Sequence, residues 1–408
     1  MTKDNFSNNQ NIIVVSIYSF PLGLAPTNRI LAYSKGLVAN GVNVCVFMPF
    51  PTDQYSSKNR LPNKGIFDSI NYCYSTKRYK SKFKIVRAFS ILSGYRKISG
   101  YLNTWRKIKK YHKENPVSSI IISTDYIPTL YLFGLLAKRI NVKSIFIFDE
   151  YPTPVRHKLK DKVPKWKEVL YKKALKNISG YVSISIKLKD YFNSLALKDS
   201  LVLSTITDTS RYENNEKTDK SKKEYVCYMG NMELSKDNVD NIIKAFGLIC
   251  KKYPELEFHL YGTPIKATKN ILVQLIKELN LTQRVFFKGK IPFNKVPVVL
   301  KNAKILVSSQ PDTFRASGGF PTKLGEYLAS GTPSLITDVG ENSKYVRNEK
   351  HLFFANPNDP HGYANRLVFI LDNYDYALNI AKNGKFFIYN NYSHIKQGKL
   401  LLDFINTI

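Results

Sequence analysis

The sequence predicts an α/β protein with two Rossmann-like, doubly wound domains, and three observations support this expectation. The chain has 408 residues, which is too long for one ordinary hydrophobic core. In both halves, short apolar runs alternate with stretches that carry apolar residues at helical spacing, as is typical of parallel sheets covered by helices. Residues 206–222 interrupt this alternation with a polar stretch rich in Asp, Glu, Thr and Lys, which we interpret as a linker.

The first domain is expected over residues 1–205 and begins with a strand–helix–strand unit. The apolar run 11–16 is consistent with a buried parallel strand. Residues 25–40 show helical spacing and stop at Gly41, a residue that suits a helix end. Residues 42–48 then form the next strand, because parallel strands need such a crossover. Further strands are expected at residues 118–123, 144–149 and 180–185.

The second domain is expected over residues 223–384 and repeats the same alternation. Helical stretches separate its short apolar runs. Its strands are expected at residues 223–229, 259–261, 285–288, 304–308 and 334–337.

The chain is strongly basic, with 62 Lys and Arg against 31 Asp and Glu and a formal net charge of +31. Residues 1–200 carry +23 of this charge, so the first domain should attract anionic lipid, nucleic acid or phosphorylated substrates. The stretch 77–113 holds 13 Lys and Arg, no acidic residue and seven interleaved aromatic residues. This mixture suits an anionic membrane surface. We favour membrane binding over the alternative of a solvated charged face whose aromatic residues lie in the core. We favour both over nucleic-acid binding, because no nucleic-acid-binding motif appears.

The sequence suggests neither a leader peptide nor a membrane span. The N-terminus is polar and its first apolar run, residues 12–15, is too short for a signal peptide. No stretch approaches the ~20 apolar residues of a spanning helix. The cysteines follow no zinc spacing and are interpreted as reduced cytosolic thiols. We therefore expect a cytoplasmic protein that is peripheral to the inner face of the membrane.

The stretch 317–334 has the composition of an anion site. Two glycines precede a helix that should begin near Pro321, since proline suits the first helical turn. Free amides at a helix start attract anions, and Lys323 adds a positive charge. Glu326 can share a face with Lys323 and could accept hydroxyl protons, as from a ribose. Taken alone, a glycine loop before an ordinary helix is the simpler interpretation.

A second stretch, residues 228–246, ends a strand at Gly230 and continues through a loop into a helix. Lys236 lies in this loop, where it could reach a diphosphate; the alternative is a solvated surface lysine. Asp237 and Asp240 at the helix start are interpreted as capping residues. No Asp-x-Asp is placed for a divalent ion, so we expect no metal.

Together these stretches resemble the C-terminal half of family 4 glycosyltransferases, which have the GT-B fold. Gly230 with Lys236 matches the family's strand–glycine loop, residues 287–289 match an F-x-G strand end, and residues 319–333 match its G-F-P-x-K-x-x-E-Y-x-A-x-G-x-P helix. The order and spacing of these motifs agree over residues 225–345.

The resemblance is looser over residues 11–50 and 144–190. It implies two domains that face a cleft, with residues 385–408 packing back on the first domain.

The resemblance also implies a donor site, mainly on the second domain. Lys236 and Lys323 would contact the diphosphate, Glu326 the ribose hydroxyls, and the backbone from Lys288 to Ile291 the base. The amides of three residues at the helix start would face the phosphates or the donor sugar, and a first-domain glycine loop would face the phosphates across the cleft. The expected donor-binding residues are Gly23, Gly230, Lys236, Lys288, Gly318, Gly319, Phe320, Lys323 and Glu326. Arg29 and Arg315 are candidate phosphate or acceptor contacts, with a helix-surface charge as the alternative for Arg29.

Three positions depart from the family pattern. Asn231 stands where many members have an arginine, and Gly318 where many have a second glutamate. Phe148 stands where some have a histidine, directly before Asp149 and Glu150. These two carboxylates follow a strand, where α/β ligand sites open. They are the catalytic candidates, to orient the donor sugar or to act as a base; helix capping and surface charge are the alternatives.

The expected function is transfer of a sugar from a nucleotide-sugar to a growing, lipid-linked glycan in cell-surface polysaccharide biosynthesis. The resemblance implies a retaining transferase that needs neither a metal nor a cofactor beyond its nucleotide-sugar substrate. Its partners would be this donor, a glycan or lipid-linked glycan acceptor and an anionic membrane, without nucleic acid. One alternative is another GT-B chemistry, such as nucleotide-sugar epimerisation. A second alternative is a non-catalytic relative that binds glycan or membrane.

Overall fold

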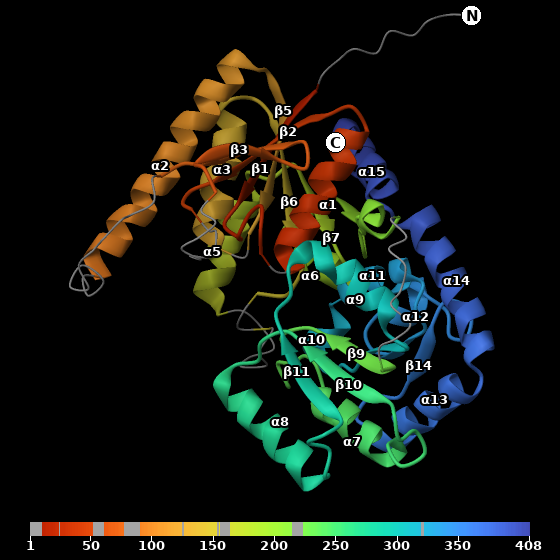
Figure 1. The fold of residues 1–408 in the computed structure, drawn as a ribbon. Coiled ribbons are helices and arrows are strands. Elements are labelled where there is room, and N and C mark those ends of the chain that lie inside the picture. Colours follow the sequence, from red (N-terminus) through yellow and green to blue (C-terminus); the bar gives the residue numbers. More distant parts are fainter. Residues whose placement is uncertain are drawn as a thin grey trace, which may run out of the picture. The chain divides into compact units, whose positions relative to one another are not determined.

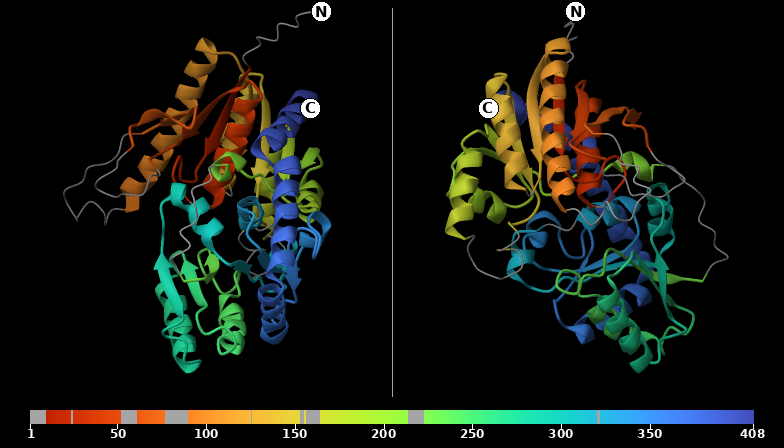
Figure 2. Two further views of the ribbon diagram at one scale, coloured as in Figure 1. Left: turned by 45° about the vertical axis from the view of Figure 1, so that its right-hand side comes forward. Right: turned by 90° about the vertical axis from the view of Figure 1, so that its left-hand side faces the viewer.

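The chain forms two compact units in a computed structural model. The structure describes residues 10–23, 25–51, 61–76, 90–124, 126–152, 155, 164–213, 223–319 and 322–408. Unit 1 comprises residues Met1–Ile206 together with His394–Ile408, and unit 2 comprises Thr207–Ser393. Figures 1 and 2 show the strands and helices of each unit. The predicted α/β class with two Rossmann-like domains is confirmed.

Unit 1 contains an eight-stranded sheet of order β3-β4-β2-β1-β5-β6-β7-β8. All neighbours pair in parallel except β3 and β4, which form an antiparallel pair that the sequence did not predict. Central strand β1 is buried on both faces, which explains its continuous apolar run. The strands are β1 Asn11–Ser16, β2 Asn43–Met48, β3 Lys64–Phe67, β4 Ile70–Tyr74, β5 Val117–Ser123, β6 Lys143–Phe148, β7 Gly180–Ser183 and β8 Asp199–Val202.

The helices of unit 1 cover both faces of this sheet. The chain runs from β1 to β2 in one direction and from β5 through β6 to β7 in the other, so right-handed crossovers place their helices on opposite faces. Accordingly, α2, α3 and α5 lie together to the left of the sheet in Figure 1, and α15 packs against α1. The helices are α1 Ala25–Ala39, α2 Ser90–Glu114, α3 Ile127–Arg139, α5 Lys165–Leu175, α6 Ile186–Leu195 and α15 His394–Thr407.

Two glycines allow α15 to dock on α1. A Cβ on Gly36 would lie 2.1 Å from the carbonyl oxygen of His394, and one on Gly398 would lie 2.3 Å from the backbone of Gly36. The two helix backbones therefore touch, and no larger side chain fits at either position. This contact attaches the end of the chain to the first domain, as the family resemblance implied.

Unit 2 contains a six-stranded, fully parallel sheet of order β11-β10-β9-β12-β13-β14. Every strand predicted for this domain is present, and β14 is an additional one. The strands are β9 Tyr225–Met229, β10 Glu257–Tyr261, β11 Val285–Gly289, β12 Ile305–Ser308, β13 Ser334–Thr337 and β14 Phe353–Ala355. From β9 the chain proceeds to β10 on one side, whereas β12 lies on the other side. The gap between β9 and β12 is therefore a topological switch point, where such sheets bind ligands.

The helices of unit 2 form two groups, with α7, α8 and α13 in one and α9, α11 and α14 in the other. The apolar sides of α7, α8 and α13 form one core cluster with the strands. Buried Leu300 of α9 and buried Leu324 and Leu328 of α11 belong to the second group. The α-helices are α7 Val239–Ile249, α8 Lys266–Glu278, α9 Val296–Asn302, α10 Phe314–Ser317, α11 Thr322–Ser330, α12 Asn342–Tyr345, α13 Pro360–Asp372 and α14 Tyr374–Asn391. Two short 3₁₀ helices are η2 Thr209–Tyr212 and η3 Phe293–Lys295.

The division of the chain differs from the predicted one at two places. The returning segment was expected from residue 385, but α14 continues to Asn391 within unit 2 and the return begins at His394. The first part of the expected linker, η2, also belongs to unit 2, and residues 214–222 lie outside the described part of the chain. Among the described residues, each helix is too short or too polar to cross a bilayer.

Candidate functional site

The switch point of unit 2 is held open by one tyrosine. Strands β9 and β12 pair only between Val226 and Ile305 and between Cys227 and Leu306. Beyond these pairs, the hydroxyl of Tyr327 on α11 accepts a hydrogen bond from the amide of Met229 (3.1 Å) and donates one to the carbonyl oxygen of Val307 (3.2 Å). The tyrosine thus replaces the missing backbone pairing beyond these residues.

Two glycines lie directly after β9 and β10, where the two backbones approach closely. The amide of Gly230 donates to the carbonyl oxygen of Tyr261 (3.0 Å). A Cβ on Gly230 would lie 2.4 Å from the buried Tyr228 hydroxyl, and one on Gly262 would lie 1.7 Å from the Gly230 carbonyl oxygen. Gly262 also has φ of 124°, which L side chains rarely adopt. Gly262 was not predicted from the sequence, although a glycine directly after a strand was the available signal.

Lys323, predicted as a donor contact, lies beside Gly230 and is anchored by Asp237. Its ammonium group donates to Asp237 Oδ1 at 2.6 Å and lies 4.6 Å from the ring centre of Tyr228. The Asp237 side chain is only 3% exposed. The expected capping role of Asp237 is wrong, because α7 begins two residues later and this carboxylate is an ion-pair partner instead. Lys323 is therefore fixed rather than mobile.

Lys236 belongs to the same loop as Gly230. Its amide donates to the carbonyl oxygen of Glu233 at 2.8 Å, which closes a turn. Its side chain is half-buried. Lys236 therefore lies in the loop that follows β9, six residues after Gly230.

Glu326, the predicted ribose contact, is held by an arginine that the sequence analysis did not identify. Arg211 on η2 donates from Nη1 to Glu326 Oε1 at 2.9 Å and from Nη2 to the carbonyl oxygen of Phe293 at 2.8 Å. The guanidinium also stacks on the Phe293 ring, 3.5 Å from its centre. Three contacts therefore fix Arg211, and Arg211 fixes one oxygen of Glu326.

Arg315, a candidate phosphate contact, forms an ion pair with the glycine loop. Its Nη1 donates to Glu233 Oε1 at 2.9 Å, and the Ser235 hydroxyl donates to the same oxygen at 2.8 Å. Burial alone would raise the pKa of Glu233, but these hydrogen bonds and the nearby cations together lower it below the ordinary value. Glu233 therefore stays ionised and links α10 to the loop after β9.

The glycine-rich helix start is only partly available to an anion. The Gly319 amide donates to the carbonyl oxygen of Ala316 at 3.1 Å, so a phosphate would have to replace that bond. Gly318 ends α10 and is buried. Phe320 lies outside the described residues, and α11 is described from Thr322. The helix predicted near Pro321 is thus present.

The expected base contact is at the end of β11. The side chain of Lys288 is exposed, with its ammonium 5.0 Å from the ring centre of Phe286. The strand ends at Gly289, whose φ is 72°. Only the backbone of this segment was expected to contact a base, and Phe293, which supports Arg211, follows four residues later.

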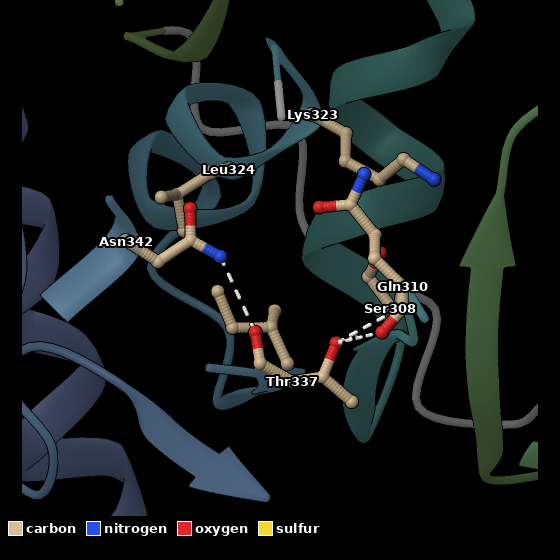
Figure 3. Close-up of a pocket in the computed structure, with 7 residues that line it drawn as sticks. Ser308, Gln310, Lys323, Leu324, Thr337 and Asn342 are labelled. Atoms are coloured by element: carbon tan, nitrogen blue, oxygen red, sulfur yellow. Dashed lines mark hydrogen bonds between the residues drawn. The ribbon is translucent and has the colours of Figure 1, made fainter. Parts of the chain in front are cut away.

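A small polar pocket adjoins Lys323 at the carboxyl ends of β12 and β13 (Figure 3). The Thr337 hydroxyl accepts from the Gln310 amide (2.7 Å) and donates to the Gln310 carbonyl oxygen (3.0 Å). Asn342 Nδ2 donates to the Thr337 carbonyl oxygen at 3.2 Å. Ser308 Oγ and Asn342 Oδ1 are buried without a hydrogen-bond partner among the described residues. The pocket is too small to hold a water molecule in this conformation.

The catalytic candidate Asp149 follows β6 in unit 1 and is paired with Arg29. Asp149 Oδ1 lies 3.1 Å from Arg29 Nε, and the Arg29 side chain is only 4% exposed. Arg29 Nη2 donates to the Tyr33 hydroxyl at 2.6 Å and to the Leu203 carbonyl oxygen at 3.2 Å. Burial alone lowers the pKa of Arg29, but Asp149 and Tyr33 raise it by more. The alternative of a helix-surface charge for Arg29 is therefore wrong.

Gly23 and Glu150 complete the predicted residues of unit 1. A Cβ on Gly23 would lie 2.0 Å from Thr27 Oγ1, which donates to the Ser19 carbonyl oxygen. Gly23 is therefore required for the conformation of the loop between β1 and α1. Glu150 directly follows Asp149 at the carboxyl end of β6 and is half-buried.

The chain is similar to known glycosyltransferases in sequence and in fold. Residues 210–386 match the family model described as glycosyl transferases group 1. A mannosylfructose-phosphate synthase of Agrobacterium fabrum is 27% identical over 141 residues, which is 33% of this chain and only 30% of that protein.

Solved structures extend the likeness over nearly the whole chain. A sucrose-phosphate synthase of Thermosynechococcus elongatus has a TM-score of 0.71 at 17% identity, covering 98% of this chain and 100% of that one. HepE of Anabaena, in complex with UDP and glucose, has a TM-score of 0.68 at 12% identity, covering 97% and 99%. The second unit of this chain therefore resembles the glycosyl transferases group 1 over residues 210–386, and the whole chain has the GT-B fold of these solved glycosyltransferases.

Proposed function

We propose that this chain transfers a sugar from a nucleotide-sugar donor to a growing, lipid-linked glycan in cell-surface polysaccharide biosynthesis. One observation carries the donor half of this proposal. At the switch point of a group 1 domain, Lys323 lies beside Gly230 and Glu326 is held by Arg211. A fixed cation and a fixed carboxylate on one helix suit the diphosphate and the ribose of one nucleotide.

On the donor side, the ribose hydroxyls would donate to Glu326, and the diphosphate would lie near Lys323 and Lys236. The reaction breaks the bond between the anomeric carbon and a diphosphate oxygen, and negative charge grows on the leaving diphosphate. Preorganised positive charge stabilises that leaving group. We propose that these two lysines supply it without a metal, and that the anomeric configuration is retained.

On the acceptor side, the attacking hydroxyl must lose a proton when its oxygen bonds to the anomeric carbon. We propose that Asp149 and Glu150 orient the donor sugar or take that proton. Asp149 is suited to orientation because Arg29 fixes its position from within the fold. Arg29 thereby acts on the substrate through Asp149 rather than by direct contact.

A lipid-linked acceptor requires the protein to work at a membrane. We propose that it is cytoplasmic, peripheral to the inner face of the membrane, and attracted there by the basic stretch 77–113. Residues 77–89 lie outside the described part of the chain. Within the described part of α2, Arg106, Lys109, Lys110 and Lys113 are exposed, and each basic residue near an anionic surface contributes about 1 kcal/mol of attraction.

The test is thermal melting of the full chain with a panel of UDP-, GDP-, ADP- and CMP-sugars. UDP-glucose comes first, because HepE has been solved with that molecule. A ligand at about 100 times its dissociation constant adds about 2.7 kcal/mol of stability. We expect a clear rise in melting temperature with one nucleotide class, and a much smaller rise for Glu326→Ala at the same concentration.

Failure of this test has a defined meaning. If no nucleotide-sugar stabilises folded protein, the transferase proposal is refuted in favour of a non-catalytic relative that binds glycan or membrane. The departures from the family pattern at Asn231 and Gly318 point to that alternative. In the structure Asn231 has a local role, since its Oδ1 accepts from the Glu233 amide at 3.3 Å.

A further inference from the structure

Helix α5 of unit 1 exposes a row of large apolar side chains. Trp166 is 63% exposed, Val169 52% and Leu170 42%. Their spacing of three and four residues places them on one face of the helix. Surface helices of globular domains normally direct such a row toward the core, and an apolar row left in solvent marks an interaction site.

The opposite face of α5 anchors the helix firmly. Tyr171, Ala174 and Leu175 are buried, and the Tyr171 ring lies 6.2 Å from that of Phe192 in a perpendicular arrangement. The helix also packs against α3. The apolar row is therefore the outer face of a well-attached helix.

Exposed lysines lie within the apolar row and along one side of it. Lys165, Lys172, Lys173 and Lys176 are all exposed, and Lys172 pairs with Glu168 at 2.8 Å. Residues 156–176 as a whole contain nine Lys and Arg and two acidic residues. The surface is thus both apolar and cationic, which complements an anionic bilayer: headgroups attract the lysines and acyl chains accept the apolar side chains. Nucleic acid would leave the apolar row in water.

We infer that α5 is a membrane-docking helix, with Trp166, Val169 and Leu170 in the interface of an anionic bilayer and the lysines at its headgroups. This inference deepens the membrane association proposed above and rests on it. The observation that carries it is separate, because α5 shares no residue with the stretch 77–113.

The position of α5 in the fold relates this membrane contact to the acceptor side of the proposed reaction. The helix connects the carboxyl end of β6 to the amino end of β7, so its first turn lies at the sheet edge where Asp149 and Glu150 follow β6. Trp166 is in that first turn. Docking through α5 would hold the acceptor edge of unit 1 near the lipid surface, from which a lipid-linked acceptor could enter.

The two tryptophans of the chain make the inference directly measurable. Substituting Trp105→Phe leaves Trp166 as the only tryptophan. Full-length Trp105→Phe protein is mixed with vesicles of phosphatidylcholine, with and without phosphatidylglycerol. We expect Trp166 emission to move to shorter wavelength and to be quenched by brominated acyl chains with the anionic vesicles only. Unchanged emission on vesicles that bind the protein would overturn the inference and leave the wider membrane proposal standing.

A charge substitution supplies the second test, by co-sedimentation of full-length protein with the same vesicles. The double variant Trp166→Glu/Leu170→Glu should bind anionic vesicles at least about tenfold more weakly, because both the apolar contact and the net charge are reduced. The matched control is Ile265→Glu/Phe386→Glu, which makes the same change at two exposed apolar positions of unit 2. Equal losses in both variants would overturn the inference.

If the wild-type protein does not bind anionic vesicles, the membrane proposal and this inference are refuted together. The nucleotide melting shift would still decide the transferase proposal on its own.

Discussion

Removing one partner of the ion pair between Lys323 and Asp237 should cost unit 2 several kcal/mol of stability, because the other charge is left buried and unpaired. The Asp237 side chain is 3% exposed and that of Lys323 is 17% exposed, with 2.6 Å between the charged atoms. Lys323→Met leaves a buried carboxylate without its cation, which costs about 3–5 kcal/mol. Asp237→Asn keeps an oxygen that can accept a hydrogen bond from Lys323, and Lys323 itself can reach solvent. We therefore expect this variant to lose only about 1–2 kcal/mol of stability. The double variant should lose about 1–3 kcal/mol less stability than the two single variants lose in total.

The assay must report on unit 2. Both tryptophans, Trp105 and Trp166, belong to unit 1, so their emission is insensitive to this unit. Urea unfolding is therefore followed by far-ultraviolet circular dichroism, and hydrogen exchange of peptides from β9 and α11 locates the change. A cost below about 1 kcal/mol for Lys323→Met, or strict additivity in the double variant, would refute the assigned pair. Nucleotide affinity of the folded variants then reports separately on the proposed diphosphate contact.

Two further predictions concern the ribose carboxylate and acid stability. Arg211→Lys keeps the positive charge but loses the forked contact to Glu326 and Phe293, so Glu326 should lose its fixed position. We expect the variant to bind a nucleotide about five- to tenfold more weakly than wild type does. Its affinity for the 2′-deoxy analogue of that nucleotide should change little. Equal weakening of both in a titration would refute the positioning role. Burial, Lys350 and Arg347 lower the pKa of His351 below 6.5. The folded state then binds fewer protons than the unfolded state, so stability should fall as pH drops below about 6.5. His351→Gln should lose less stability between about pH 7 and about pH 5 in urea titrations, and an identical loss would contradict this.

Local patterns in the sequence predicted most of the fold. Buried parallel strands such as β1 and β9 consist of continuous apolar runs, and glycine marks the end of α1. The helix start before α11 was also readable, since glycine and proline restrict the backbone directly. The antiparallel pair of β3 and β4 was not predicted, because β3 has exposed and half-buried residues that resemble those of a loop, although β4 itself is mostly buried.

The contacts around the candidate site were less predictable, because they join residues that are distant in sequence. Arg211 lies 115 residues before Glu326 and Asp237 lies 86 residues before Lys323. Arg211 stands in a polar stretch that resembles a linker, and Asp237 stands where helix caps are common. Each side chain had a plausible local explanation, and only the packing of η2 and of the β9 loop against α11 shows its actual partner.

In both units an arginine holds a carboxylate that is a candidate substrate contact: Arg29 fixes Asp149, and Arg211 fixes Glu326. Stability does not account for these pairs, because the cost of removing two charges from water offsets most of their attraction, and apolar residues would serve the fold as well. What the pairs do provide is a carboxylate whose charge and direction are set before a ligand arrives. Groups set in advance lose less entropy on binding and act more strongly on developing charge. For this reason we place the substrate contacts of the proposed transferase at these two carboxylates.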